Sequence, residues 1–445
     1  MQTPIADFVT QYAKKENSRF HMPGHKGQAF CGCEAYDITE ITGADSLYEA
    51  EGIIAESEKN ASVLFHTQKT LFSTEGSSQC IRAMLYLAIN HQKSAHRPYV
   101  IAGRNVHKAF LYAAALLDFD IVWLYPEEMH SLCSCQITTA QLEHELCKRK
   151  QPPAAVYLTT PDYLGGQLSI QDFADLCHQY HTILAVDNAH GAYLHFFKES
   201  MHPMDLGADI CCDSAHKTLP VLTGGAYLHI SKHAPNYFCK YAKQAMALFG
   251  STSPSYLTLT SLDLCNAYLA ADYCQKLSAT ITRIEKVRHT LQQNGWRVAP
   301  TDPLKLTVQM PHGLTGQELS NRLHTASVEC EYADSEYIVF MITPENTDND
   351  YARLVQALGI NPHKYNEPTI LHPAACAQSL SVREAFFARQ ELIPVNESLG
   401  RICGAPAVSC PPAIPIVVSG EVIDENAIDL FEYYGITSVQ VVRDH

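Results

Sequence analysis

The order of apolar and polar positions along the chain predicts strands that alternate with helices from about residue 49 to residue 265. Short apolar runs, such as YVIAG at 99–103 and TILAVD at 182–187, predict buried strands. Longer segments with apolar residues every three or four positions, such as 77–90, predict the helices between them. We therefore expect an α/β fold with a mostly parallel seven-stranded sheet covered by helices on both faces.

The same patterns divide the chain into five expected parts. A short amphipathic helix (PIADFVTQYAKK) opens the chain, a long helical stretch covers about 255–295, and mixed strands and helices follow. The C-terminal segment carries a helix, a proline-rich turn and a short βα end. The expected parts are an N-terminal arm (1–48), a large domain (49–265), a linking helix (266–295), a small α+β domain (296–366) and a C-terminal domain (367–445).

Composition narrows the class of protein. The chain has 445 residues, of which 46% are hydrophobic and 18% charged, as in an ordinary globular protein. Its net charge of −15 argues against nucleic acid and anionic membrane surfaces as partners. No apolar run approaches the ~18 residues of a membrane-spanning helix, and the N-terminus lacks a secretory pattern. We expect a cytoplasmic protein.

The cysteines and histidines do not form a metal-binding motif. Sixteen cysteines are scattered along the chain, several of them within apolar segments such as those around Cys80, Cys211 and Cys265, which is typical of reduced, buried thiols. Two Cys-x-Cys pairs, at 31–33 and 133–135, lack the spacing and the second pair of a zinc site. We expect no metal.

The predicted carboxyl ends of the strands carry the candidate chemistry, because ligands of open α/β sheets bind there. Gly76, Ser77 and Ser78 follow the first strand and begin a helix, which predicts an anion cradle. Asp187 ends an apolar strand, where a carboxylate needs a cation or several donors. Lys217 follows ADICCDS among small and apolar residues, where a lysine can act as a Schiff-base amine.

Together these residues match the four needs of pyridoxal 5′-phosphate. That cofactor requires a Schiff-base lysine, an acid at the pyridine nitrogen, an anion cradle for its phosphate and a ring-stacking partner. In order, the candidates are Lys217; Asp187; Gly76, Ser77 and Ser78 with Ser214 and His216; and His107.

At this point the sequence resembles the bacterial ornithine/lysine/arginine decarboxylases, which are fold-type-I pyridoxal-phosphate enzymes. The resemblance runs nearly end to end. It rests on FHMPGHKG, DITEITGADSLYEAEG, STEGSSQCI, GRNVHKA, TTPDYLGG, VDNAHGAYLHF, DSAHKTL, STSPSY, SVREAFFA and SCPPAIPIVVSGE. It implies a short form without the receiver-like N-terminal domain of the large inducible enzymes, and loss of CO₂ from arginine, lysine or ornithine to leave agmatine, cadaverine or putrescine.

The resemblance also implies roles for individual residues. Lys217 would hold the cofactor, Asp187 would face the pyridine nitrogen, His107 would stack on the ring, and His190 would lie near the phenolic oxygen. Lys217 or His216 would return a proton to Cα. The phosphate would be held by Gly76, Ser77, Ser78, Ser214 and His216, and Ser251, Thr252 and Ser253 would reach the phosphate of a neighbouring subunit. A homodimer with shared active sites follows.

One segment departs from the family pattern. The family commonly has Tyr-Pro-Pro-Gly-Ile-Pro near the substrate entrance, whereas this chain has Cys410 and Ala413 in place of the Tyr and the Gly. This change leaves the substrate open. Glu421 is a candidate for binding the distal cation of the substrate, and an exposed turn residue is the alternative.

Three other interpretations stay open at this point. The chain could be an aminotransferase or a lyase of an unusual amino acid on the same fold, with Arg353 or Arg383 clamping the substrate carboxylate. It could be a non-catalytic pyridoxal-phosphate-binding homologue, against which the presence of Lys217, Asp187 and His107 argues. A cysteine-rich metal protein is the third alternative.

Overall fold

The chain folds into two compact units. The computed structural model describes residues 1–92, 96–361, 363–365, 371, 375–406 and 414–443. The first unit comprises Met1–Lys93, Ala154–Val156 and Ile170–Lys276, and the second comprises Ser94–Pro153, Tyr157–Ser169 and Leu277–His445. The five-part division expected from the sequence stays a prediction.

The predicted seven-stranded sheet is confirmed. The strands run in the order β1-β7-β6-β5-β4-β2-β3. Strand β7 pairs antiparallel with β1 and β6, whereas β5 with β6 and β2 with β3 pair in parallel. The strands are β1 (Lys69–Ser73), β2 (Tyr99–Gly103), β3 (Asp120–Leu124), β4 (Ala155–Thr159), β5 (Leu184–Asp187), β6 (Ile210–Asp213) and β7 (Ala226–Ile230).

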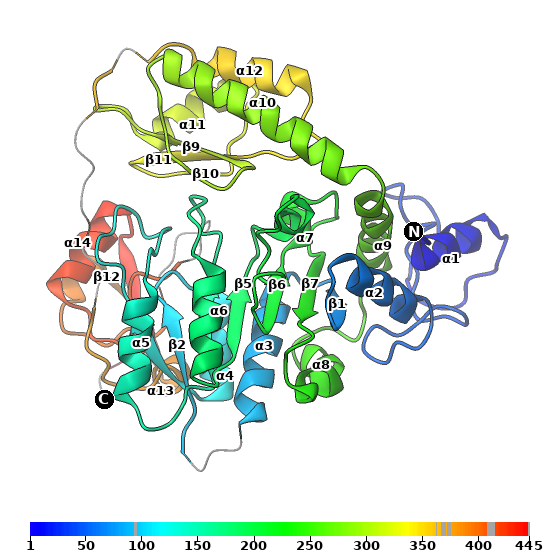
Figure 1. Ribbon diagram of the computed structural model, residues 1–445, viewed down its shortest axis with the longest axis horizontal. Helices are drawn as coiled ribbons and strands as arrows, with labels where there is room; N and C mark the ends of the chain where they lie inside the picture. Colours follow the sequence, from blue (N-terminus) through cyan, green and yellow to red (C-terminus); the bar gives the residue numbers. More distant parts are fainter. Residues whose placement is uncertain (93–95, 362, 366–370, 372–374, 407–413, 444–445) are drawn as a thin grey trace. The chain divides into compact units, whose positions relative to one another are not determined.

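The first unit surrounds its strands with helices. Helices α3 and α8 pack against each other, and α1, α2 and α9 form a second group (Figure 1). These helices are α1 (Pro4–Lys14), α2 (Ile53–Leu64), α3 (Ser77–His91), α6 (Ile170–Gln179), α7 (Ala215–Thr218), α8 (Asn236–Leu248) and α9 (Tyr256–Ala270), with the 3₁₀ helix η1 (Ala192–Phe196). The sequence patterns gave no indication of α2 or α8.

The first helix shows why the N-terminal arm is ordered. Pro4 occupies the first position of α1, and Ile5 and Val9, four residues apart, are buried on one face. The N–H groups of Ile5 and Ala6 both donate to Oδ2 of Asp263 in α9, at 2.9 Å each. A buried carboxylate from a distant helix therefore caps α1 in place of a local side chain.

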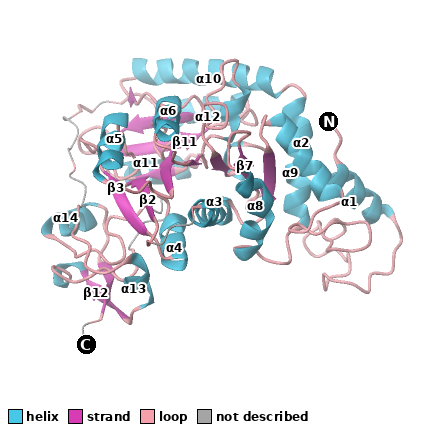
Figure 2. Cartoon of the chain, turned by 60° about the horizontal axis from the view of Figure 1, so that its bottom comes forward, coloured by secondary structure: helices cyan, strands magenta, loops and turns pink. Residues whose placement is uncertain are grey.

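The second unit contains two smaller sheets. The antiparallel order β10-β11-β9-β8 forms one sheet, and β12 pairs with β13, close to α14 (Figure 2). Its strands are β8 (Arg297–Val298), β9 (Lys305–Gln309), β10 (Tyr332–Ala333), β11 (Tyr337–Met341), β12 (Gln390–Pro394) and β13 (Ser438–Val442). Its helices are α4 (Lys108–Leu117), α5 (Thr139–Lys148), most of α10 (Tyr273–Gln293), α11 (Gly316–Thr325), α12 (Asp348–Leu358), α13 (Val382–Phe387), η2 (Val395–Glu397) and α14 (Glu425–Tyr433).

Four helices of the second unit begin at a motif that the sequence displays. A hydroxyl residue accepts a hydrogen bond from the N–H three residues later, and the side chain at that later position bonds back. The pairs are Thr138 with Gln141, Thr315 with Glu318, Thr347 with Asp350, and Ser381 with Glu384. These helices start where local side chains satisfy the free N–H groups of the first turn.

Two predicted details differ in the structure. The helical stretch at 255–295 is broken, because Ala271 leaves the helical conformation and the carbonyl of Asp272 begins a new helix by accepting from Gln275 and Lys276. The C-terminal end runs helix then strand, α14 before β13, rather than strand then helix. None of the helices in the described residues combines the length and the hydrophobicity needed to cross a bilayer.

Candidate active site

Three strand ends and one strand start meet at one edge of the sheet in the first unit. The pairing sets Ser73 of β1 opposite Ala226 of β7, and Tyr227 opposite Asp213 of β6. On the other side of β6, Cys212 is opposite Asp187 of β5. The residues that follow these strands are therefore brought together, as expected for the carboxyl edge of an α/β sheet.

Lys217 is held at this edge by a single turn of helix. Helix α7 follows β6 directly, and the N–H of Lys217 donates to the carbonyl of Ser214 at 2.9 Å. The N–H of the neighbouring His216 donates to the carbonyl of Gly225 at 3.1 Å, which fastens the turn to the start of β7. The Nζ atom of Lys217 lies 3.0 Å from Nε2 of His190, so the amine and the imidazole can exchange a proton.

Asp187 ends β5 as a buried carboxylate. Its side chain is in the interior, and Oδ1 accepts a hydrogen bond from the N–H of Ala189 at 3.1 Å. The Sγ atom of Cys212 lies 3.8 Å from the same oxygen. Burial raises the pKa of the Cys212 thiol, with a further contribution from the Asp187 charge. The thiol therefore stays protonated and donates to the carboxylate.

A second buried carboxylate, Asp213, lies next to this group. Its Oδ2 is 3.0 Å from Nε2 of His202 and 3.1 Å from Nε2 of His229, and its Oδ1 accepts from Nδ2 of Asn188 at 2.7 Å. Burial alone would raise the pKa of Asp213, but the two histidines outweigh burial and hold this pKa well below its usual value. The ionised Asp213 at the end of β6 thus holds Asn188, which directly follows Asp187 at the end of β5.

The turn after β1 forms a cradle with small residues and hydroxyl groups. Gly76 has φ +71°, and its N–H donates to the carbonyl of Gly224 at 2.8 Å. A Cβ at Gly224 would lie 2.7 Å from the carbonyl oxygen of Thr74, so only glycine permits this approach. The hydroxyls of Ser214 and Ser77 are 2.8 Å apart. The cradle joins the β1 end to the β6 end.

These residues fit a cofactor that carries an aldehyde and a phosphate. Helix α3 begins at the cradle and has no side-chain cap, so N–H groups of its first turn can bind an anion. The amine of Lys217, the imidazole of His190 and the carboxylate of Asp187 belong to the same unit and the same sheet edge. The donor set therefore includes an anion site, an amine and an acid.

The structure does not test the roles of four further predicted residues. His107 belongs to the second unit, where it precedes α4 and its Nδ1 accepts from the N–H of Ala109 at 3.1 Å. Ser251, Thr252 and Ser253 are in the first unit and are exposed. The roles of these four residues stay predictions.

The two candidate substrate residues have different outcomes. Cys410 lies outside the described residues. Glu421 is 1% exposed, so the alternative of an exposed turn residue is wrong. Its Oε2 lies 3.2 Å from Nη2 of Arg104 and accepts from the N–H of Val418 at 2.7 Å. A substrate cation would have to compete with Arg104 for this carboxylate.

The sequence interpretation missed the support behind the site. Asp213, His202 and His229 were not proposed, although Asp213 ends the apolar run ICCD just as Asp187 ends its own strand. The same argument, a carboxylate that needs partners at the end of a buried strand, would have found Asp213. Nothing local marks the two histidines, because they come from a loop and from β7.

Comparison with solved structures defines the class of fold. The crystal structure of a lysine decarboxylase from Francisella novicida superposes with a TM-score of 0.81, covering 99% of this chain and 81% of that chain at 16% identity. The serine palmitoyltransferase of Sphingomonas wittichii superposes with a TM-score of 0.56, covering 80% of this chain and 83% of that chain at 12% identity. The chain has the fold of the fold-type-I pyridoxal-phosphate enzymes.

Sequence comparison then identifies the family. The model described as Orn/Lys/Arg decarboxylase, major domain, matches residues 3–312, and the C-terminal domain of the same family matches residues 365–440. The arginine decarboxylase of Bacillus subtilis is 28% identical over an alignment of 459 positions, which covers 96% of this chain and 92% of that protein. The chain belongs to the Orn/Lys/Arg decarboxylase family, and the resemblance drawn from its motifs is confirmed.

Family membership establishes the chemistry at a coarse level. The protein is a pyridoxal-phosphate-dependent decarboxylase of a basic amino acid. The predicted cofactor and class of reaction are confirmed. Pyridoxal phosphate, when bound, accepts the electron pair that the departing CO₂ leaves at Cα.

Proposed function

We propose that the protein is an arginine decarboxylase that uses the first-unit site around Lys217. The relative from Bacillus subtilis, which bears the name arginine decarboxylase, aligns over nearly the whole of both chains and supports this choice of substrate. The observation that carries the site is the 3.0 Å contact between Nζ of Lys217 and Nε2 of His190 at the sheet edge that also bears Asp187.

In this proposal Lys217 and His190 handle protons on the reacting side of the site. Lys217 would supply the amine that holds the cofactor aldehyde. When it is not bonded to the cofactor, its Nζ would take a proton from His190 and deliver it to Cα. His216 is the other candidate donor. Its Nδ1 lies 3.0 Å from the carbonyl of Gly225, which fixes Nδ1 as a donor, so Nε2 is the nitrogen that would deliver the proton.

Asp187 and the cradle would hold the two ends of the cofactor. Asp187, kept ionised, would retain a proton on the pyridine nitrogen and so strengthen the withdrawal of electrons from Cα. Ser77, Ser78 and the hydroxyl of Ser214 would bind the phosphate at the start of α3, and His216 would add a charge there. The Asp213 network would keep the two strand ends, and hence the two groups, at a fixed separation.

We also propose a homodimer with shared sites. Ser251, Thr252 and Ser253 are exposed, as donors to the phosphate of another subunit would be in a single chain. The N-terminal arm exposes large apolar side chains: Phe20 is 96% exposed, Met22 65% and Phe30 81%. Such residues are usually covered, which a second copy of the chain would do. The proposal keeps the predicted role of His107 as the residue that stacks on the cofactor ring.

A cytoplasmic location completes the proposal, and the contacts of Arg383 agree with decarboxylation rather than transamination. The cysteines of the described residues are free thiols, as in a reducing compartment. Arg383, one candidate clamp for an aminotransferase, donates to the carbonyls of Ala115 and Leu116 and covers the ring of Phe387. Arg383 is therefore engaged in holding α13 against α4, which supports decarboxylation.

A substrate comparison tests the proposal. The holoenzyme is incubated with arginine, lysine or ornithine, and CO₂ and the amine are measured. We expect agmatine from arginine at the highest kcat/KM. A higher kcat/KM for lysine or ornithine would reject arginine as the substrate while leaving the class of reaction intact. Transfer of the amino group without release of CO₂ would contradict the decarboxylase mechanism.

A complementation experiment tests the shared sites. Lys217→Ala and the triple variant of Ser251, Thr252 and Ser253 to Ala are each expected to be weakly active. Mixed dimers of the two should recover about a quarter to a half of the activity, because one of their two sites is then intact. Mixed dimers no more active than the parents would exclude a site completed by the partner.

A further inference from the structure

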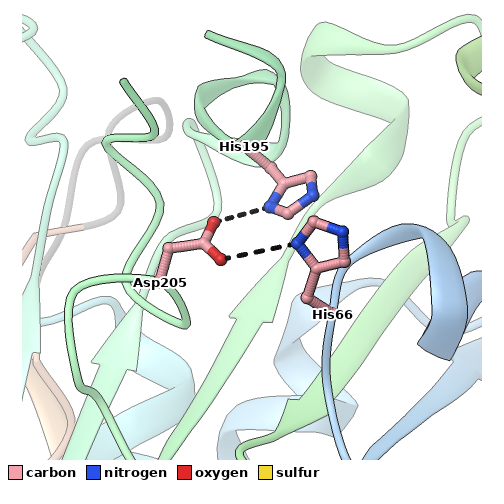
Figure 3. A group of neighbouring side chains, drawn as sticks. All are labelled: His66, His195 and Asp205. Carbon is pink, nitrogen blue, oxygen red and sulfur yellow. Dashed lines mark hydrogen bonds and ion pairs between the residues drawn. The ribbon is translucent and has the colours of Figure 1, made fainter. Parts of the chain in front are cut away.

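Two histidines and an aspartate converge at the surface of the first unit, and the reaction does not use them. Figure 3 shows His66 and His195 directed at the two carboxylate oxygens of Asp205. Nδ1 of His195 lies 2.6 Å from Oδ2, and Nδ1 of His66 lies 4.0 Å from Oδ1. Each residue offers one ligand atom, and the three atoms all lie within 4.8 Å of one another. We call these residues the His66–His195–Asp205 cluster.

The cluster joins three segments that are far apart in sequence. His66 occupies the turn between α2 and β1 with φ +54°, an unusual conformation that turns the chain toward the other two residues. His195 lies on η1, and Asp205 lies in the loop before β6. Residues at such spacing form no short sequence motif. The motif-based prediction of no metal therefore did not take them into account.

Neighbouring groups fix the inner two ligands. The hydroxyl of Ser200 donates to Oδ2 of Asp205 at 2.5 Å, and the ring of His195 packs against Phe65 with centroids 5.3 Å apart. The carboxylate therefore keeps its orientation toward the two imidazoles. Such outer contacts orient ligands in metal sites.

The three side chains of the cluster differ in how much of each is exposed to solvent. The side chain of His195 is 6% exposed, that of Asp205 23% and that of His66 70%. His195 is thus buried, Asp205 is partly exposed, and His66 borders solvent. A site of this form has an entry path for an ion and room for a water molecule as a fourth ligand.

We propose that the His66–His195–Asp205 cluster binds one divalent transition-metal ion of the zinc class. Two imidazole nitrogens and one carboxylate oxygen form a donor set that suits Zn²⁺ or Co²⁺, whereas Ca²⁺ and Mg²⁺ prefer oxygen ligands. On binding, the hydrogen bond between His195 and Asp205 gives way to two bonds to the metal. Any proton on Nδ1 of His195 passes to solvent.

A second group of potential ligands in the first unit is a weaker candidate. His202, Cys211 and Asp213 also lie within 4.8 Å of one another, but all three are fully buried. Their polar atoms already have uses: Nε2 of His202 bonds to Asp213, and Nδ1 of His202 accepts from the N–H of Met204 at 3.3 Å. This group supports the strand ends and offers an ion no access from solvent.

A metal in the surface cluster would act as a clip. It would fasten the turn before β1 to the loop before β6, and these two strands flank β7 in the sheet. Because the ion binds the folded chain and not the three separated ligands of the unfolded chain, it would raise the melting temperature. This role is independent of the decarboxylation described above.

The test uses chelator-treated holoenzyme that keeps its bound cofactor. Zn²⁺ is titrated by calorimetry, Co²⁺ by its visible absorption, and the melting temperature is recorded with and without Zn²⁺. We expect one Zn²⁺ per chain, an intense Co²⁺ band typical of four-coordinate geometry, and a higher melting temperature. His66→Ala and Asp205→Asn should each weaken Zn²⁺ binding at least tenfold and remove the thermal shift.

His181→Ala is the matched control. His181 is exposed and also has a left-handed backbone, with φ +51°, but it lies outside the cluster. This variant should bind Zn²⁺ as the unmodified chain does. His66 is itself exposed, so His66→Ala should fold normally.

Three outcomes would overturn the proposal. One is the absence of stoichiometric Zn²⁺ binding, and another is equal binding by the His66→Ala and His181→Ala variants. The third is binding that persists in His66→Ala and disappears in Cys211→Ala, which would assign the ion to the buried group instead. A change in decarboxylase activity is not needed for either conclusion.

Discussion

Two cations of the molecule have different surroundings: the buried Arg104 of the second unit and the half-buried Lys217 of the first. In the second unit Arg104 meets Glu421 at 3.2 Å, donates to the carbonyl of Ile416 at 2.8 Å and covers the ring of Trp123. Lys305 likewise donates to the carbonyl of Asp162 at 2.6 Å. In the first unit the amine of Lys217 lies 3.0 Å from Nε2 of His190. Arg104 and Lys305 therefore have fixed acceptors for their positive charges, whereas Lys217 lies beside an imidazole that can exchange a proton.

This difference separates charges that stabilise the fold from charges that carry out chemistry. A buried cation with a carboxylate and carbonyl partners cannot easily gain or lose a proton, and removing one member leaves the other uncompensated. A lysine beside a histidine can change its protonation at moderate pH. The comparison predicts that the first kind of substitution lowers stability, and the second kind lowers activity.

The largest expected effect is on catalysis. Lys217→Ala should lower kcat by more than about a thousandfold, because the amine that holds the cofactor and moves the proton is lost. Lys217→Arg, which keeps a positive charge, should be equally inactive. Measured without cofactor, both variants should unfold at nearly the denaturant concentration of the unmodified chain. A large loss of stability would mean that Lys217 is a structural cation like Arg104.

Next comes the ion pair in the second unit. Arg104→Met should lower the free energy of unfolding by about 3–5 kcal/mol, because Glu421 is left buried without its cation. Adding Glu421→Gln should recover a large part of that loss. Chemical unfolding of the single and double variants measures both. If the double variant is no more stable than the single one, the pair is not a compensated unit.

A pH effect should follow from Asp162 in the second unit. Burial, the largest influence, raises the pKa of Asp162 from 3.8 to about 6 in the folded chain. The folded state then binds more protons than the unfolded state between these values, so stability falls as pH rises from about 4 to about 6 and is level above. The loss should be about 1–3 kcal/mol. Asp162→Asn should flatten this part of the unfolding profile; an unchanged slope would rule out Asp162 as its source.

The smallest expected effect concerns helix starts. Thr315→Ala removes the side chain that accepts from the N–H of Glu318, and should cost about 1 kcal/mol of stability. Thr325→Ala, at the exposed end of the same helix, should cost less than about 0.5 kcal/mol. Equal costs for the two variants would show that the capping contact contributes nothing beyond helix propensity.

Local patterns account for much of the fold and for the centre of the site. Each of the seven strands is a short apolar run, and the rule that ligands lie at strand ends was enough to select Lys217, Asp187 and the Gly76 turn. The motif-based resemblance then indicated the family. The residues concerned are neighbours in sequence of the strands that position them.

Partners distant in sequence could not be predicted. Arg104 and Glu421 are 317 residues apart, and no local pattern reveals that one neutralises the other. The break at Ala271 was missed because neither glycine nor proline marks it, and the sequence on both sides favours helix. The His66–His195–Asp205 cluster depends on a turn, a 3₁₀ helix and a loop that only the folded sheet brings together.

The cap of α1 sets a time order for synthesis of the chain. The N–H of Ile5 donates to the carboxylate of Asp263, which is synthesised 258 residues after Ile5. At about 5–20 residues per second, a ribosome needs about 13–52 s to reach it. During that interval the amphipathic N-terminal segment lacks both its cap and the α9 surface on which it packs. The nascent chain therefore presents this segment to chaperones, or to modifying enzymes, long before the folded protein hides it.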